Sequence, residues 1–325
     1  MTPRVGLVLG AGGTVGQAYQ AGVLSALHQE LGWDPRGADR LVGTSAGSIT
    51  ATLLRLGLPP SDLVAYVQGG EATSPEGVEL AARIGSDRPM LTPFDPRNVL
   101  RPWSLPSRQL LGRVARRPWS FRPAAAAAAM VPAGTVNIEL HTQVLRQVTD
   151  DWPRHLWLCA ARRRDGARTV FGRPGSPPAA LAAAVAASCA IPGYFRPVTI
   201  DGVEYLDGGV HSSTNADVLR TEKLDLVLVV ASMSAAGGRV RAADGAIRYA
   251  AHRRLDREVA QLERGGTAVV RIEPSRSSIG AMGTNAMAAD RSSDVVAAAY
   301  AATVRYLGRE PVAERLAPIR STAHR

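Results

Sequence analysis

The sequence has few cysteines, few aromatic residues and almost no lysine. Among its 325 residues there are two cysteines, Cys159 and Cys189, aromatic residues make up 5%, and Lys223 is the only lysine. Both cysteines lie in apolar stretches, which is typical of buried free thiols. We therefore expect no disulfide framework and no cysteine-based metal site. Neither a metal ion nor an organic cofactor is expected.

Long hydrophobic runs are also missing. No apolar stretch reaches the roughly 18 residues that a membrane-spanning helix needs, and the alanine-rich stretches are short. Residues 1–4 lead directly into an apolar stretch, without the charged region, long apolar run and cleavage site of a secretory signal. The sequence therefore favours a cytoplasmic protein.

Acidic residues are fewer than basic ones, 28 against 38, which gives a net charge of +10. Heavy use of arginine, alanine, glycine and proline is also what a GC-rich genome produces. An excess of positive charge favours contact with an anionic surface, either a membrane or a nucleic acid. No nucleic-acid-binding motif accompanies the charge. We expect no nucleic-acid partner, and peripheral contact with an anionic membrane stays open.

The sequence begins with a strand, a glycine-rich turn and a helix. An apolar strand over residues 4–9 is followed by the glycine-rich residues 10–16, and such a turn at a helix N-terminus presents N–H groups to an anion. That anion could be a dinucleotide pyrophosphate or the oxyanion of acyl transfer. A dinucleotide site needs an acidic residue at the end of the next strand, and Asp34 has no apolar strand before it. The oxyanion is the favoured interpretation.

The next strand, over residues 40–42, runs into Gly43-Thr44-Ser45-Ala46-Gly47, the sequence form of a nucleophile elbow. A serine on such a turn has a strained backbone, and side chains at Gly43 and Gly47 would collide with neighbouring elements. A pattern of this kind also arises by chance in a chain with 32 glycines. Two successive strand–turn–helix units predict a parallel sheet with Ser45 and the glycine-rich loop at one edge.

A third motif, Asp207-Gly208-Gly209, ends a strand expected over residues 203–207. With these three motifs in this order, the chain resembles the patatin-like phospholipases over roughly residues 4–215. Residues 18–24 and 187–195 are similar as well. The resemblance implies an α/β fold with three layers, α/β/α, around a central and mostly parallel sheet. It also implies a serine acyl hydrolase, a phospholipase A or lipid esterase, with a lipid or ester substrate.

The same resemblance implies roles for particular residues. Ser45 would be the nucleophile and Asp207 the general base, and the amides of the glycine-rich loop would form the oxyanion hole. These loop residues are Gly12, Gly13 and Thr14. Val15 stands where the family usually carries Arg or Lys, so the site would depend on backbone N–H groups and the helix terminus alone. Ala216 follows Asn215 where the family often shows Pro. Both departures bear on the substrate class.

Two other interpretations stay open. A triad carboxylesterase of the α/β-hydrolase fold needs a histidine after the acid, and the candidates are His211, His252 and His324. None has the loop setting expected of a triad histidine, which favours a Ser45/Asp207 dyad. The other alternative is a non-catalytic module that binds lipid or nucleotide. The sequence carries no signal of an oligomeric state.

We expect a patatin-like domain over residues 1–310 and a basic tail over residues 311–325, frayed from Arg315 onward. Proline and arginine punctuate an insertion over about residues 71–134, in which Trp103, Leu105 and other apolar residues alternate with cations. We interpret it as a lid whose apolar residues contact acyl chains while its arginines, from Arg97 to Arg122, meet lipid phosphates. The alternative is a solvated helical segment. Further strands are expected over residues 156–161, 169–171, 198–200, 224–230 and 267–272, helices over 138–148, 181–188, 248–264 and 294–307, and a flexible loop over 275–285.

Overall fold

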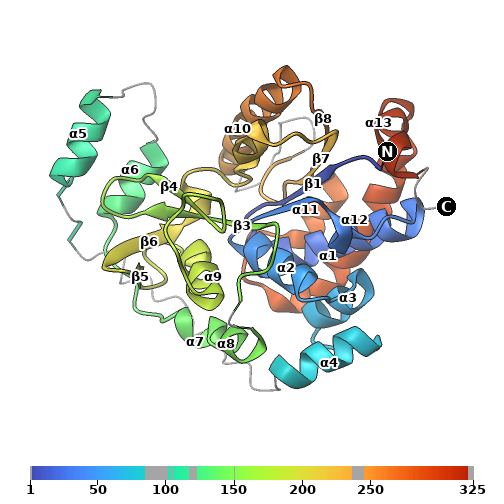
Figure 1. The fold of residues 1–325 in the computed structure, drawn as a ribbon, viewed down its shortest axis with the longest axis horizontal. Helices are drawn as coiled ribbons and strands as arrows, with labels where there is room; N and C mark the ends of the chain where they lie inside the picture. Colours follow the sequence, from blue (N-terminus) through green and yellow to red (C-terminus); the bar gives the residue numbers. More distant parts are fainter. Residues whose placement is uncertain are drawn as a thin grey trace.

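The computed structural model describes residues 2–84, 102–103, 105–116, 123–149, 151–235 and 245–320. Within these residues, eight strands form one sheet in the order β5-β6-β3-β2-β1-β7-β8, and β4 pairs with β3 outside this path (Figure 1). The strands are β1 (Val5–Leu9), β2 (Arg40–Thr44), β3 (Leu156–Arg162), β4 (Arg168–Phe171), β5 (Val198–Ile200), β6 (Val203–Asp207), β7 (Leu226–Val230) and β8 (Ala268–Ile272).

The centre of the sheet is parallel and one side of it is antiparallel. Strands β3, β2, β1, β7 and β8 run in parallel, whereas β4 and β6 are antiparallel to β3 and β5 is antiparallel to β6. Thr44 pairs with Cys159, and Asp207 pairs with Ala160, the next residue of β3. The register therefore brings the end of β2 and the end of β6 to the same edge, on either side of β3.

Helices cover both faces of the sheet. One face carries α1 (Gly13–Leu31), α2 (Ala46–Arg55), α3 (Pro60–Gln68), α9 (Leu181–Cys189), α12 (Ser292–Leu307) and α13 (Glu310–Arg320), and the other carries α10 (Gly245–Arg264) and the 3-10 turn η5 (Ala216–Thr221). Alternate strand residues face the two layers, because successive side chains point to opposite sides. Leu7 and Leu9 join the first core, and Val8 joins the second. This arrangement is the predicted three-layer α/β/α fold, with a mostly parallel sheet.

The remaining elements are short. They are η1 (Pro35–Gly37), α4 (Pro75–Ile84), α5 (Arg108–Arg116), α6 (Pro123–Met130), α7 (Glu139–Thr142), α8 (Leu145–Val148), η4 (Gly208–Val210), α11 (Arg276–Met282) and η6 (Ala289–Arg291). The helix expected over residues 138–148 is divided into α7 and α8. No helix in the described part of the chain is both long and apolar enough to span a membrane.

Two expectations about the C-terminal third are wrong. Residues 275–285 are not a flexible loop, because the Ser275 side chain accepts a hydrogen bond from Ser278 N and caps α11, whose Met282 is buried. The tail is not frayed from Arg315 to Arg320, because these residues belong to α13, which buries Leu316 and Ile319 against the core. Residues 321–325 lie outside the described residues, and the division of the chain at residue 310 stays a prediction.

Of the insertion over residues 71–134, the structure describes α4, α5, α6 and short adjoining segments. Helix α6 contacts the turn η4, whereas α5 lies at the periphery, where the Ser107 hydroxyl donates to the Arg164 carbonyl (Figure 1). Trp103 and Leu105 are exposed, with 51% and 90% of their surface accessible. Several of the predicted interfacial arginines, among them Arg97, Arg101, Arg117 and Arg122, lie outside the described residues. The lid interpretation stays a prediction.

Candidate active site

Ser45 occupies the sharp turn between β2 and α2. Its backbone has φ 54° and ψ −124°, a strained conformation for a residue with a side chain. The two glycines around it explain how the turn fits. A Cβ on Gly47 would lie 2.0 Å from the Leu9 carbonyl oxygen, and a Cβ on Gly43 would lie 2.5 Å from Ser48 Cα. The turn therefore packs backbone against backbone, which only glycine allows.

The backbone of Ser45 is held from two sides. Its N–H donates to Ser188 Oγ at 3.0 Å, and Ser188 Oγ donates in turn to the Cys159 carbonyl at 2.7 Å. The Ser48 hydroxyl donates to the Ser45 carbonyl at 2.6 Å. Sequence reasoning gave Ser188 no role, although this residue lies in the segment 187–195 that resembles the family. Its contact joins α9, β3 and the elbow at the point where Ser45 emerges.

Asp207 ends β6 and caps the turn η4. Its carboxylate accepts a hydrogen bond from Gly209 N at 2.6 Å and lies beside the Ser45 hydroxyl. Burial raises the pKa of Asp207 to about 6, against the lowering effect of the Ser45 hydroxyl and Gly209 N. A carboxyl group with a pKa close to neutrality is ionised at pH 7 and still takes up a proton readily. The pair has the chemistry of a nucleophile and its base.

The glycine-rich loop lies between β1 and α1 and next to this pair, since a Cβ on Gly209 would lie 3.4 Å from Ala11 Cβ. Most of its N–H groups have acceptors. Those of Gly10, Ala11, Val15 and Gly16 donate to the carbonyls of Val230, Ser213, Ala286 and Gly12. In the described part of the chain, the N–H groups of Gly12, Gly13 and Thr14 have no acceptor. These free amides stand at the N-terminus of α1, a 19-residue helix, and such a terminus attracts negative charge.

Three residues to which the sequence analysis gave no role support this loop. Gln20 Nε2 donates to the Gly10 carbonyl at 2.6 Å, and the Ser232 hydroxyl donates to the Gly16 carbonyl at 3.4 Å. The guanidinium of Arg248 donates to the carbonyls of Ser232 and Ser234, at 3.1 and 3.2 Å. Val15 itself is buried. A cation therefore stands behind the loop, on α10, and holds the segment that follows β7.

Of the three histidines considered for a catalytic triad, two lie in the described residues. His252 lies on α10, with Nδ1 2.7 Å from Glu273 and Nε2 3.8 Å from Asp256, so both ring nitrogens face carboxylates. His211 ends the turn η4, four residues after Asp207, and His324 lies outside the described residues. Among the described residues no group of His, Cys, Asp or Glu side chains is arranged to hold a metal ion. Cys159 and Cys189 are buried free thiols, as expected.

Comparison with known proteins agrees with this geometry. The sequence model of the Patatin-like phospholipase family matches residues 7–220, about two thirds of the chain. The chain belongs to the patatin-like phospholipase family. The matched region begins in β1 and ends in η5, so it contains the glycine-rich loop, the elbow and the Asp-Gly-Gly turn.

Solved structures similar to this chain include VipD from Legionella pneumophila, with 16% identity, a TM-score of 0.44, and coverage of 94% of this chain and 66% of that one. ExoU from Pseudomonas aeruginosa, in its heterodimeric complex with SpcU, has 19% identity and a TM-score of 0.37, with 97% and 52% covered. The chain thus spans about one half to two thirds of the length of these proteins. No curated protein matches it.

Proposed function

We propose that this protein is a serine acyl hydrolase, a phospholipase A or lipid esterase, that cleaves a lipid ester through an acyl-Ser45 intermediate. The observation that carries the proposal is the buried Asp207 carboxylate beside the hydroxyl of Ser45, which stands on the strained turn between β2 and α2. The free amides of the glycine-rich loop beside it supply the second requirement, a place for the negative charge that develops on the substrate.

The reaction follows from these groups. Ser45 Oγ attacks the ester carbonyl carbon while Asp207 accepts the hydroxyl proton. The carbonyl oxygen becomes an oxyanion, stabilised by the N–H groups of Gly12, Gly13 and Thr14. When this intermediate collapses, the C–O bond to the alcohol breaks, and Asp207 returns the proton to the departing alkoxide. The products of this half-reaction are the free alcohol and the acyl-enzyme.

Deacylation uses the same groups. A water molecule attacks the acyl carbon, and Asp207 accepts one of its protons. Collapse of the second oxyanion breaks the bond to Ser45 Oγ, which regains its proton from Asp207, and the carboxylic acid leaves. One carboxylate serves both halves of the cycle, so no histidine is required. This scheme differs from a triad, in which the acid orients a histidine.

The lipid character of the substrate is the part of the proposal that rests on family membership and on charge. The net charge of +10 suits an enzyme that meets anionic lipid. We place the protein in the cytoplasm, in peripheral contact with membranes. The exposed Trp103 and Leu105 lie just before α5, whose first and last residues are Arg108 and Arg116. Such a combination suits an interfacial segment.

Covalent labelling tests the proposal. A fluorophosphonate probe reacts with an activated serine, and peptide mapping should place the label on Ser45. Ser45→Ala should lose the label and at least about 10³-fold in ester hydrolysis, while its melting curve stays close to that of the parent, because the change removes a single oxygen. Label on another serine, or unchanged turnover in folded Ser45→Ala, would rule out the assignment. A protein that binds lipid vesicles without being labelled would be a binding module instead.

A further inference from the structure

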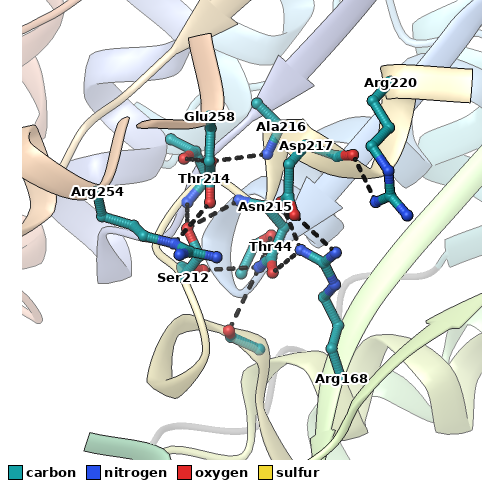
Figure 2. Close-up of polar contacts among 11 residues, drawn as sticks. Thr44, Arg168, Ser212, Thr214, Asn215, Ala216, Asp217, Arg220, Arg254 and Glu258 are labelled. Carbon is teal, nitrogen blue, oxygen red and sulfur yellow. Dashed lines mark hydrogen bonds and ion pairs between the residues drawn. The ribbon is translucent and has the colours of Figure 1, made fainter. Parts of the chain in front are cut away.

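A buried network of polar side chains lies beside the dyad, and Asn215 stands at its centre (Figure 2). Asn215 is fully buried, and its backbone is left-handed, with φ 54° and ψ 27°. Its side-chain nitrogen Nδ2 lies 2.7 Å from the Ser212 carbonyl, 3.2 Å from Thr44 Oγ1 and 3.3 Å from the Gly208 carbonyl. Its oxygen Oδ1 accepts from Arg168 Nη1 at 3.1 Å. Every polar atom of this side chain is engaged.

Two of these partners are the immediate neighbours of the proposed catalytic residues. Thr44 precedes Ser45, and Gly208 follows Asp207. The Gly208 carbonyl belongs to the same peptide group as Gly209 N, which donates to the Asp207 carboxylate at 2.6 Å. A peptide between two glycines has little steric restraint of its own. A contact that fixes the Gly208 carbonyl therefore also fixes the direction of the Gly209 N–H, which donates to Asp207.

Within the described residues, Asn215 is the side chain that joins this turn to β2. The Gly208 carbonyl also accepts from His211 N and Ser212 N, at 3.0 and 3.2 Å, but both donors belong to the turn itself. They shape the turn without fixing its position relative to the elbow. The contact from Asn215 Nδ2 to Thr44 Oγ1 makes that connection.

An ion pair sets the orientation of the Asn215 amide. Arg168, on β4, holds Asp217 with two hydrogen bonds, at 2.6 and 3.0 Å, and its Nη1 also donates to Asn215 Oδ1 (Figure 2). Burial alone would lower the pKa of Arg168, but its hydrogen bonds with Asp217 raise it, so the guanidinium stays charged. Since Arg168 donates only, it turns Oδ1 towards itself and Nδ2 towards the acceptors.

We infer that Asn215 is a positioning residue that holds the elbow and the Asp-Gly-Gly turn in one register, so that the Ser45 hydroxyl meets the Asp207 carboxylate. The inference rests on the proposed function of that pair. Asparagine is the residue type that meets every demand at this position. It donates and accepts at once, and it tolerates a left-handed backbone. An aspartate would present a carboxylate to the carbonyls of Gly208 and Ser212.

The test compares Asn215→Gly with Thr214→Val. Glycine keeps the left-handed backbone accessible and removes only the side chain. Thr214 is the adjacent residue, and its hydroxyl donates to buried Glu258 at 2.6 Å; among the described residues, its side chain makes no hydrogen bond to Thr44 or Gly208. Thr214→Val therefore damages the same network without touching the link between elbow and turn. Both variants are measured with a short p-nitrophenyl ester, as pH profiles of kcat and KM, together with melting curves.

We expect Asn215→Gly to lower kcat by about 10²-fold, the scale of a misplacement near 1 Å, with little change in KM. The acidic limb of kcat/KM should move to higher pH, because a loosened Gly209 N–H no longer favours ionised Asp207. In the described part of the chain, the Cys189 thiol, whose pKa burial raises to about 12, also lies near Asp207, and His211 follows Asp207 by four residues. His211→Asn should leave the limb in place. Thr214→Val should lower the melting temperature and keep both kcat and the limb.

Several outcomes would overturn the inference. Asn215→Gly with the parent's kcat and pH limb would do so, as would losses no larger than those of Thr214→Val. If Asn215→Gly does not fold, Arg168→Lys replaces it, because a lysine keeps the charge but cannot hold both Asp217 and the amide. Arg168→Lys should also move the acidic limb of kcat/KM to higher pH, and an unchanged limb counts against the inference. A parent that neither hydrolyses the ester nor takes up a fluorophosphonate removes the proposed function itself.

Discussion

The Ser45 hydroxyl lies beside the Asp207 carboxylate, across the width of a single strand. Thr44 and Asp207 pair with consecutive residues of β3, Cys159 and Ala160, so β3 separates the proposed nucleophile from its proposed base. Sheet geometry fixes the separation of neighbouring strands. The relative position of the two groups is therefore set by backbone pairing, and side chains such as Ser188 and Asn215 adjust it.

Asp207→Asn should silence ester hydrolysis as completely as Ser45→Ala does. An amide keeps the shape of the carboxyl group and can still accept from Gly209 N, but it is not a base. We expect a loss of at least about 10³-fold in kcat/KM. The measurement is hydrolysis of a short p-nitrophenyl ester by Asp207→Asn, His211→Ala and His252→Ala in parallel. Substantial turnover in Asp207→Asn, with a dead histidine variant, would replace the dyad with a triad.

Asp207→Asn should also be more stable than the parent at neutral pH. Burial raises the pKa of Asp207 from 3.8 to about 6, so between these pH values the folded state holds a proton that the unfolded state has released. Folding stability then falls as pH rises through this window and is flat above it. Asparagine never ionises and escapes this loss, which amounts to at most roughly 3 kcal/mol.

The check is the melting temperature of both proteins at pH 4 and pH 8. We expect Asp207→Asn to exceed the parent at pH 8, and the difference to shrink at pH 4. Identical differences at the two pH values would mean that ionised Asp207 carries no folding penalty.

Gly13→Ala should impair the oxyanion loop. Gly13 has φ 63°, and a Cβ there would lie 2.6 Å from the Ala286 carbonyl oxygen, so the loop must move. Loss of one oxyanion donor typically costs about 10²–10³ in kcat. Gly37→Ala is the matched control, because a Cβ on Gly37 meets nothing within 4 Å. Rates of ester hydrolysis and of fluorophosphonate labelling are compared. Equal rates in the two variants would show that the amides near Gly13 do not stabilise the reaction.

Binding to anionic vesicles should depend on α5. Exposed charges are screened over roughly 8 Å at physiological ionic strength, so binding should weaken steeply as salt rises. Arg108→Gln with Arg116→Gln should reduce binding several-fold at low salt. The control pair is Arg276→Gln with Arg305→Gln, exposed arginines on α11 and α12, which lie away from α5 (Figure 1). Sedimentation with vesicles measures both pairs. Salt-insensitive binding, or equal losses in the two pairs, would favour a solvated segment at α5.

The sheet and the two strand ends that carry Ser45 and Asp207 were predictable because their signals are local. Apolar runs followed by glycine motifs predict β1, β2 and β6, and a continuous apolar run predicts β7, without long-range information. Helix α11 was not predicted, because its serine-rich sequence is typical of a loop. Its N-terminal cap, the hydrogen bond from Ser278 N to Ser275 Oγ, depends on one local backbone geometry. Helix α13 has few apolar residues and a proline, Pro318, so its stability comes from tertiary burial of Leu316 and Ile319.

The role of Asn215 could not be predicted from the sequence. The sequence analysis named Asn215 only as the residue before Ala216, where the family often shows a proline. Its partners Thr44 and Arg168 are distant in sequence, and no local pattern pairs them with it. Ser188 and Gln20 lie in the similar segments 187–195 and 18–24, but the resemblance assigned them no role. A residue that joins separate segments is not marked by a local motif, because its role depends on which segments the fold brings together.

The hydrogen bond from Val15 N to the Ala286 carbonyl has a consequence for how this chain can be divided. Ala286 lies beyond residue 220, where the family match ends, and so does β7, which pairs with every residue of β1. A fragment trimmed to the matched residues would keep all three motifs and lose the scaffold of the glycine-rich loop. Co-expressed fragments split near residue 220 would have to reassemble before either half could take part in catalysis. The last third of the polypeptide is thus a structural partner of the first, covalently attached to it.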